Sequence, residues 1–143
     1  MLSCLILISN FGNKHTMNIH VVDDNESITQ MLKKYFTLLG HACTVSNSGR
    51  NALTLIEDQK FDVILLDLAM PEFSGRDIVS HLVKSGKIKN TNIVVLTASS
   101  PSMDYEDELK EMGVHSILKK PIDPDSIMNH IQQFDKKPKV VNN

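Results

Sequence analysis

The sequence predicts an α/β fold: a doubly wound, five-stranded parallel sheet flanked by five helices, which cover both of its faces. From residue 18 onward, short apolar runs alternate with longer stretches whose apolar residues recur at three- and four-residue steps. This is the order expected of strands joined by crossover helices. Five such repeats leave few packings other than a parallel sheet between two helical layers, because crossover connections are right-handed.

The composition supports one globular domain. The chain has 143 residues, of which 41% are hydrophobic and 22% charged, which is ordinary for a domain of this length. Fifteen Lys and Arg residues against seventeen Asp and Glu leave no basic excess, which disfavours direct nucleic-acid binding. Cys4 and Cys43 have neither metal-site spacing nor the density of a secreted disulfide scaffold. We therefore expect a cytoplasmic protein without membrane insertion.

The two ends are set apart from the predicted domain at residues 17–135. The apolar run from Leu2 to Ile8 has no preceding Lys or Arg and is shorter than a membrane span, which disfavours a targeting signal. Residues 1–16 fit either a loose extension or residues that precede a natural start at Met17, and the sequence leaves both open. Residues 136–143 are expected to be a flexible basic tail, with no output domain after it.

The first part of the domain is predicted as strand, helix, strand, helix. The run Ile19–Val22 indicates a buried strand, and the helix after it is expected to stop at Gly40. Residues 42–45 indicate a shorter strand, and Ser48 can cap the second helix. The inward positions expected for the first helix are Ile28, Met31, Leu32, Tyr35 and Leu39. Those expected for the second helix are Ala52, Leu53 and Ile56.

The second part begins with the run Val63–Leu66, which is apolar enough for a central strand covered on both faces. A loop at 70–75 leads into a helix that ends at Gly86. Residues 93–96 indicate the fourth strand, and a helix between Ser102 and Gly113 follows. Residues 114–118 indicate the last strand, and Pro124 occupies the first position of the last helix. The inward positions expected for these three helices are Ile78, Val79, Leu82 and Val83, then Met103, Leu109 and Met112, then Ile127, Ile131 and Phe134.

Polar side chains follow four of the five predicted strands. Asp23 and Asp24 follow the first, Asp67 the third, Thr97 the fourth and Lys120 the fifth. Ligands of such sheets bind beyond the carboxyl ends of the strands, so these groups are expected to converge on one rim. Crowded carboxylates repel one another unless a divalent cation compensates them, and Mg²⁺ is the hard, oxygen-seeking choice. Such a rim can hold a phosphoryl group, and a carboxylate could attack phosphorus there.

Four motifs together resemble a known family, the receiver domains of two-component response regulators. They are Val22-Asp23-Asp24, the segment from Leu66 to Pro71 with Gly75 closing its loop, Leu96-Thr97-Ala98, and Lys120-Pro121. The resemblance covers residues 17–134. It implies a flavodoxin-like fold with strand order 2-1-3-4-5, and a chemotaxis-type, single-domain receiver.

The resemblance implies that Asp67 is the phosphoacceptor. It would take a phosphoryl group from the phosphohistidine of a histidine kinase or a phosphotransfer protein. Thr97 would move toward the new phosphoryl oxygens, and Lys120 would neutralise them. The protein would then be a signalling switch, and not an enzyme beyond its own phosphorylation and dephosphorylation.

The resemblance also implies how Mg²⁺ would be held. Asp24 and Asp67 would ligate the ion, Asp23 would act largely through a bound water, and the backbone carbonyl of Ala69 would complete the protein ligands. Output would pass to a partner protein through the face formed by the fourth helix, the fifth strand and the fifth helix. Many family members carry Phe or Tyr where this chain has Ile117, so we expect the coupling to run through the backbone of residues 97–103.

Three other functions remain as alternatives. A phosphatase that forms an aspartyl phosphate is disfavoured, because a second acid usually stands two residues after the nucleophile and Ala69 stands there. A flavin-binding module is disfavoured because Asp23 and Asp24 would repel its phosphate. A receiver-like scaffold that works without phosphorylation is the third. The six histidines have no ligand spacing, so none is predicted to bind metal or to donate phosphate.

Overall fold

The structure is a computed structural model that describes residues 16–98 and 102–135 of the chain. Five parallel strands form one sheet in the order β2-β1-β3-β4-β5, which confirms the predicted topology. The strands are β1 (Asn18–Val22), β2 (Ala42–Ser46), β3 (Val63–Asp67), β4 (Ile93–Thr97) and β5 (Ser116–Lys119). The helices are α2 (Glu26–Leu38), α3 (Gly49–Asp58), α4 (Gly75–Ser85), α5 (Met103–Met112) and α6 (Pro124–Ile131), with short 3-10 turns η1 (Lys87–Asn90) and η2 (Gln132–Phe134).

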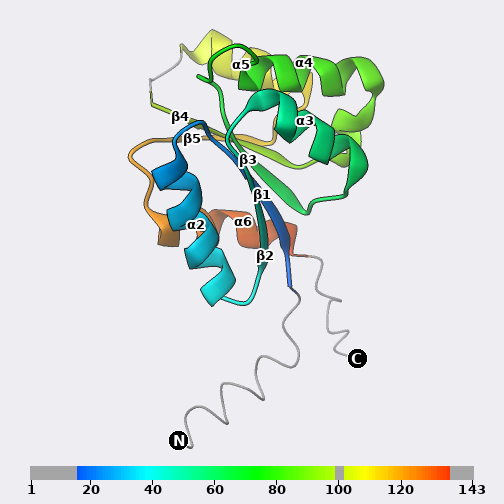
Figure 1. Cartoon of the computed structure of the whole chain (residues 1–143). Helices are drawn as coiled ribbons and strands as arrows, with labels where there is room; N and C mark the ends of the chain where they lie inside the picture. The colour runs from blue at the N-terminus through cyan, green and yellow to red at the C-terminus, as the bar shows by residue number, and fades with distance from the viewer. Residues whose placement is uncertain (1–15, 99–101, 136–143) are drawn as a thin grey trace, which may run out of the picture.

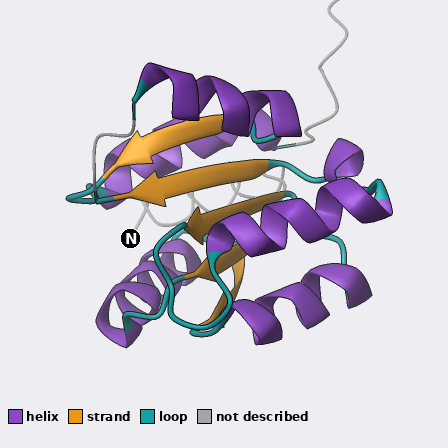
Figure 2. Cartoon of the chain, turned by 90° about the horizontal axis from the view of Figure 1, so that it is seen from above, coloured by secondary structure: helices purple, strands orange, loops and turns teal. Residues whose placement is uncertain are grey.

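The sheet separates two helical layers (Figures 1 and 2). Helices α3, α4 and α5 cover one face, and α2 and α6 cover the other. The expectations for an extension at residues 1–15 and a tail at 136–143 lie outside the described residues.

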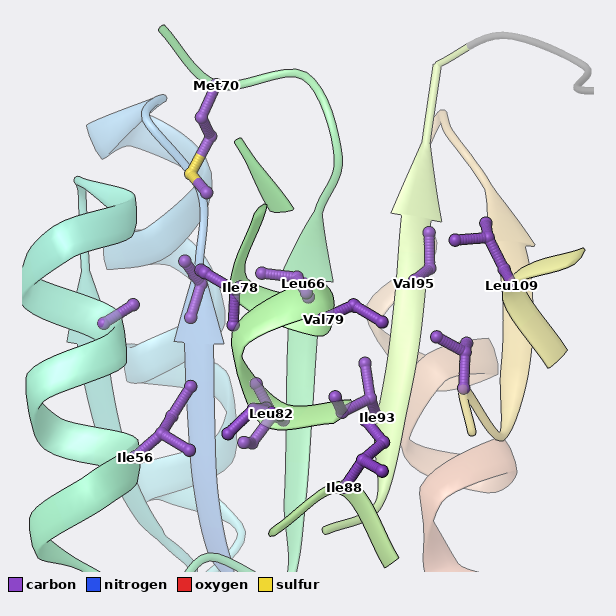
Figure 3. Close-up of a cluster of buried hydrophobic side chains, with 14 of the residues drawn as sticks. Ile56, Leu66, Met70, Ile78, Val79, Leu82, Ile88, Ile93, Val95 and Leu109 are labelled. Atoms are coloured by element: carbon purple, nitrogen blue, oxygen red, sulfur yellow. The ribbon is translucent and has the colours of Figure 1, made fainter. Parts of the chain in front are cut away.

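Each inner strand divides its side chains between two hydrophobic cores. On β3, Ile64 and Leu66 pack under α3, α4 and α5, whereas Val63 and Leu65 pack under α2 and α6. This follows from the alternation of side chains along a strand. Figure 3 shows the first core, in which α4 supplies three side chains of the labelled set and α5 supplies one. Strands β3 and β4 are buried along their whole length, so the residues at their carboxyl ends are anchored in the interior of the domain.

The expected helix ends are present, and glycine provides two of them. Gly86 and Gly113 end α4 and α5 with φ of 78° and 118°, a left-handed backbone that glycine adopts at little cost. Ser48 and Ser102 cap α3 and α5 as expected, by accepting hydrogen bonds from backbone N–H groups. The predicted Pro124 position at the start of α6 is confirmed as well.

Three expected core positions are wrong. Met31, Val83 and Met103 are 40%, 41% and 80% exposed. In α2 the buried line runs through Thr29, Leu32 and Phe36, because a helix turns about 100° per residue and only one narrow stripe faces the sheet. Met31 lies one step off that stripe.

The last strand starts later than expected, and α5 is less buried than expected. The last strand begins at Ser116 and not at residue 114. Met103 lies in the first turn of α5, of which only Leu109 is buried. Helix α5 therefore contributes less to the core than the apolar spacing of its sequence indicated.

Candidate functional site

Three carboxylates meet where β1 and β3 end. The two strands are neighbours, and Val22 pairs in register with Leu66, so the residues that follow, Asp23 and Asp67, lie side by side. One oxygen each from Asp23, Asp24 and Asp67 falls within 4.8 Å of the others. Asp23 and Asp67 are buried, and Asp24 is exposed. The rim predicted from strand order therefore forms for these three acids, with one side open to solvent.

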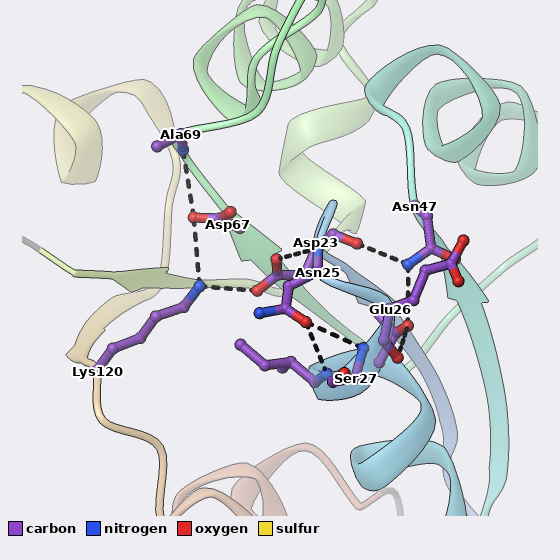
Figure 4. A network of polar contacts seen from close by, with 10 residues as sticks. Asp23, Asn25, Glu26, Ser27, Asn47, Asp67, Ala69 and Lys120 are labelled. Carbon is purple, nitrogen blue, oxygen red and sulfur yellow. Dashed lines mark hydrogen bonds and ion pairs between the residues drawn. The ribbon is translucent and has the colours of Figure 1, made fainter.

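Lys120 reaches the same rim from the other edge of the sheet (Figure 4). Its Nζ lies 2.8 Å from Asp23 Oδ2 and 3.7 Å from Asp67 Oδ1. The residue directly follows β5, and its backbone N–H donates to the carbonyl oxygen of Thr97 at 2.8 Å. The Lys120–Pro121 bond is cis. Lys119, one position earlier, is exposed, because successive side chains along a strand point to opposite faces.

The surroundings of Asp67 disfavour its charged form and raise its pKa. Burial and the nearby Asp23 carboxylate raise the pKa of Asp67 from 3.8 to about 6, against the opposing effects of Lys120 and of the Ala69 N–H. Three carboxylates face one ammonium group, so the described side chains leave negative charge uncompensated. A divalent cation would compensate that charge, and clustered carboxylate oxygens are the donors that Mg²⁺ prefers.

The loop after β3 holds Asp67 closely. The Ala69 N–H donates to Asp67 Oδ1 at 3.2 Å, and the Gly75 N–H donates to the carbonyl oxygen of Leu68 at 3.2 Å. A Cβ atom at Gly75 would lie 2.3 Å from the carbonyl oxygen of Asp67, so only glycine fits there without displacing the backbone of the acid. The Ser74 hydroxyl caps α4 directly after this loop.

Thr97 lies at the end of β4, between β3 and β5, and is 6% exposed. The structure thus places it on the same edge of the sheet as the acids, next to the backbone of Lys120. Part of the segment expected to couple the site to its output, residues 99–101, lies outside the described residues.

Two asparagines support the rim, and the sequence reading did not identify their roles. The Asn47 side chain donates to the carbonyl oxygen of Asp23 and to Thr29 Oγ1, both at 2.9 Å. The Asn25 N–H donates to Asp23 Oδ1 at 2.9 Å, and its side chain caps α2. Asn47 directly follows β2, so its place at the carboxyl end of a strand was the signal that could have found it.

Comparison with known proteins identifies the family. Residues 19–132 match the sequence model of the response regulator receiver domain. The chain belongs to this family. Receiver domains are signalling switches of two-component systems; they bind Mg²⁺ at an acidic cluster and interact with histidine kinases or phosphotransfer proteins. In this receiver, Asp23, Asp24 and Asp67 form the candidate cluster.

Individual proteins that are similar to this chain support the same family assignment. The chain is 30% identical over 127 residues to the probable transcriptional regulator ycf27 of Cyanidium caldarium, covering 89% of this chain but only 49% of that relative. It superposes on the chemotaxis protein CheY4 of Vibrio cholerae with a TM-score of 0.75 at 29% identity, covering 84% of this chain and 99% of the other.

A second similar structure contains ligands. It is the response regulator TrrA of Thermotoga maritima in complex with Mg²⁺ and BeF, with a TM-score of 0.70 at 25% identity over 83% of this chain and 99% of the other.

The chain described here spans about half the length of ycf27. Among its described helices, none combines the length and apolar character needed to cross a membrane.

Proposed function

We propose that Asp67 accepts a phosphoryl group from the phosphohistidine of a histidine kinase or phosphotransfer protein, in a Mg²⁺-dependent reaction in the cytoplasm. The observation that carries this proposal is the rim itself. Asp67 is buried beside two further carboxylates and 3.7 Å from the Lys120 ammonium group. A buried acid with two like-charged neighbours is costly for stability, so the arrangement calls for a function.

The proposed metal ligands are Asp23, Asp24, Asp67 and the backbone carbonyl of Ala69. The carboxylates supply hard oxygen donors within reach of one ion. Bound Mg²⁺ would supply positive charge that keeps Asp67 ionised and neutralises phosphoryl oxygens. The Mg²⁺ and BeF in the similar TrrA structure support this assignment.

In the proposed reaction a carboxylate oxygen of Asp67 attacks phosphorus in line. The P–O bond forms as the P–N bond to the donor histidine breaks, and the electron pair of that bond returns to the imidazole nitrogen. The nucleophile is already an anion, so no general base is needed. Lys120 can swing from Asp23 toward the new phosphoryl oxygens, and the Thr97 hydroxyl can donate a hydrogen bond to them.

The phosphoryl group adds about one negative charge to a rim that already has an excess of it. We propose that Thr97 and the loop that follows it respond, and that the response reaches the face formed by α5, β5 and α6, where a partner protein binds. Helix α5 suits this role because Leu109 is its only buried residue, so repositioning it disturbs little of the core.

The test is the intact mass of the protein after incubation with acetyl phosphate and Mg²⁺. We expect one phosphoryl group on the wild type and none on Asp67→Asn. Asp58→Asn is the matched control, because Asp58 is an exposed acid at the end of α3, and it should be modified as the wild type is. Modification of Asp67→Asn to the wild-type extent would place the acceptor elsewhere, and an equal gain after removal of Mg²⁺ would refute the role of the metal.

A further inference from the structure

Two histidines that are distant in sequence meet at the start of the last strand. His115 directly precedes β5, and His130 lies in the last turn of α6. Their ring centroids are 6.2 Å apart, and the rings stand nearly perpendicular to each other. The Ser116 hydroxyl lies between them, 3.0 Å from His115 Nδ1 and 2.7 Å from His130 Nε2. We call this cluster the histidine pair.

Hydrogen-bond accounting shows that the histidine pair offers an electron pair. One hydroxyl has a single hydrogen to donate, so it can donate to only one of the two ring nitrogens. The nitrogen that receives this hydrogen carries a lone pair, which is the group that ligates a metal ion. The other nitrogen faces the hydroxyl oxygen with its own N–H, and it can ligate once that proton has passed through solvent to the second nitrogen of its ring. Burial lowers the pKa of His130 from 6.5, and the charge of the nearby His115 lowers it further. The neutral form required for metal binding is therefore favoured at His130.

The histidine pair is held in place and remains accessible. The ring of His115 packs edge-on against Phe134, with centroids 4.7 Å apart, and its backbone N–H donates to the carbonyl oxygen of Ile93 at 2.9 Å. His115 is exposed and His130 half-buried. An ion from solvent can therefore reach His115, and a small rotation of each side chain would bring both ring nitrogens to one ion.

We propose that His115 Nδ1 and His130 Nε2 bind one divalent transition-metal ion of the zinc class. Imidazole nitrogen suits Zn²⁺, Cu²⁺ and Ni²⁺, whereas Mg²⁺ prefers oxygen ligands. Two imidazoles fill two positions of a tetrahedral Zn²⁺ ion, and water fills the others. The donor chemistry thus separates this site from the acidic rim, and it does not depend on the proposed phosphorylation of Asp67.

Bound metal would link His115, directly before β5, to the last turn of α6. A ligand that binds only the folded state stabilises it, so Zn²⁺ should raise the melting temperature of the folded protein. The proposed metal site and the acidic rim lie at opposite ends of β5. His115 directly precedes the strand, and Lys120 directly follows it.

The test is calorimetric titration of the full chain with Zn²⁺ in excess Mg²⁺, which competes with Zn²⁺ for the carboxylate oxygens of the acidic rim. We expect one Zn²⁺ per chain for the wild type, and at least tenfold weaker binding for His115→Phe and His130→Gln. The first variant keeps an aromatic ring against Phe134, and the second keeps a side chain able to hydrogen-bond Ser116. His81→Gln is the control, because His81 is an exposed histidine whose ring also packs on a phenylalanine, Phe73.

Each result of this titration either supports or overturns the proposed Zn²⁺ site. The site is supported if either pair variant loses Zn²⁺ binding while His81→Gln keeps the wild-type affinity. Zn²⁺ should then raise the melting temperature of the wild type and the control only. No Zn²⁺ binding by the wild type, or binding by both pair variants within threefold of it, overturns the proposal. Both results can be read whether or not Asp67 accepts phosphate.

Discussion

Strand β1 contains one buried ionisable side chain, His20, and ends directly before another, Asp23. The two side chains have different surroundings. His20 and Asp23 are 0% and 1% exposed. An Asp23 carboxylate oxygen lies 2.8 Å from the Lys120 ammonium group. His20 contacts the ring of Phe61 and the Ser46 hydroxyl, and its Nδ1 has no hydrogen-bond partner among the described residues. The buried acid after the strand has a cation beside it, whereas the buried histidine within the strand has a hydroxyl and an aromatic ring.

Burial also shifts the pKa values of two groups in this part of the sheet, His20 and Asp67. Burial lowers the pKa of His20 from 6.5 to about 4, and burial with the Asp23 charge raises that of Asp67 from 3.8 to about 6. Burial acts against the charged form in both cases, and the signs differ because one group is a base and the other an acid. Between pH 4 and 6 the two groups therefore affect stability in opposite directions.

The largest effect is expected when the cation of the rim is removed. Lys120→Met leaves Asp23 and Asp67 buried without their ammonium partner, and breaking a buried ion pair in this way costs about 3–5 kcal/mol. Urea unfolding at pH 7.5 without Mg²⁺ measures the loss. Lys119→Met, at the exposed neighbouring lysine, should stay within about 0.5 kcal/mol of the wild type. Equal losses in both variants would show that the rim does not rely on the Lys120 charge.

The next effect is the pH dependence that His20 imposes. Its folded pKa lies below its unfolded pKa, so the unfolded state binds the proton first as pH falls from 6.5 to about 4. Stability contributed by neutral His20 is complete above pH 6.5 and declines by about 3 kcal/mol over that window. His20→Gln, which can still hydrogen-bond Ser46, should lose less stability between pH 7 and 4.5 in urea unfolding. A variant curve parallel to that of the wild type would contradict this account.

The smallest effect is a gain of stability at Asp67. Its folded pKa lies above its unfolded pKa, so the ionised form is a cost at neutral pH, and protonation between pH 6 and 3.8 relieves it. Asp67→Asn imitates the neutral acid and should raise the free energy of unfolding at pH 7.5 without Mg²⁺ by about 2 kcal/mol. The gain should shrink toward pH 4 and in saturating Mg²⁺. A destabilised variant in metal-free buffer would mean that the acids of the rim are not in electrostatic conflict.

Much of the fold and of the rim could be predicted because both are encoded locally. Apolar runs at strand spacing, glycines at helix ends and polar residues after each strand can be read from neighbouring positions, and a parallel sheet brings the ends of its strands to one edge. The errors at Met31 and Met103 arose where several apolar residues competed for one helix face, which only packing against the sheet resolves.

By itself, the sequence determined the order of elements, the two helical layers and the chemistry of the residues at the strand ends. Only the tertiary structure decided which of those residues touch: Lys120 and Asp23 are 97 positions apart, and His115 and His130 lie on separate elements that no spacing pattern relates. The physical reason is that helix and strand periodicity depends on residues a few positions apart. Contacts between distant residues depend instead on strand register and on how each helix packs back onto the sheet.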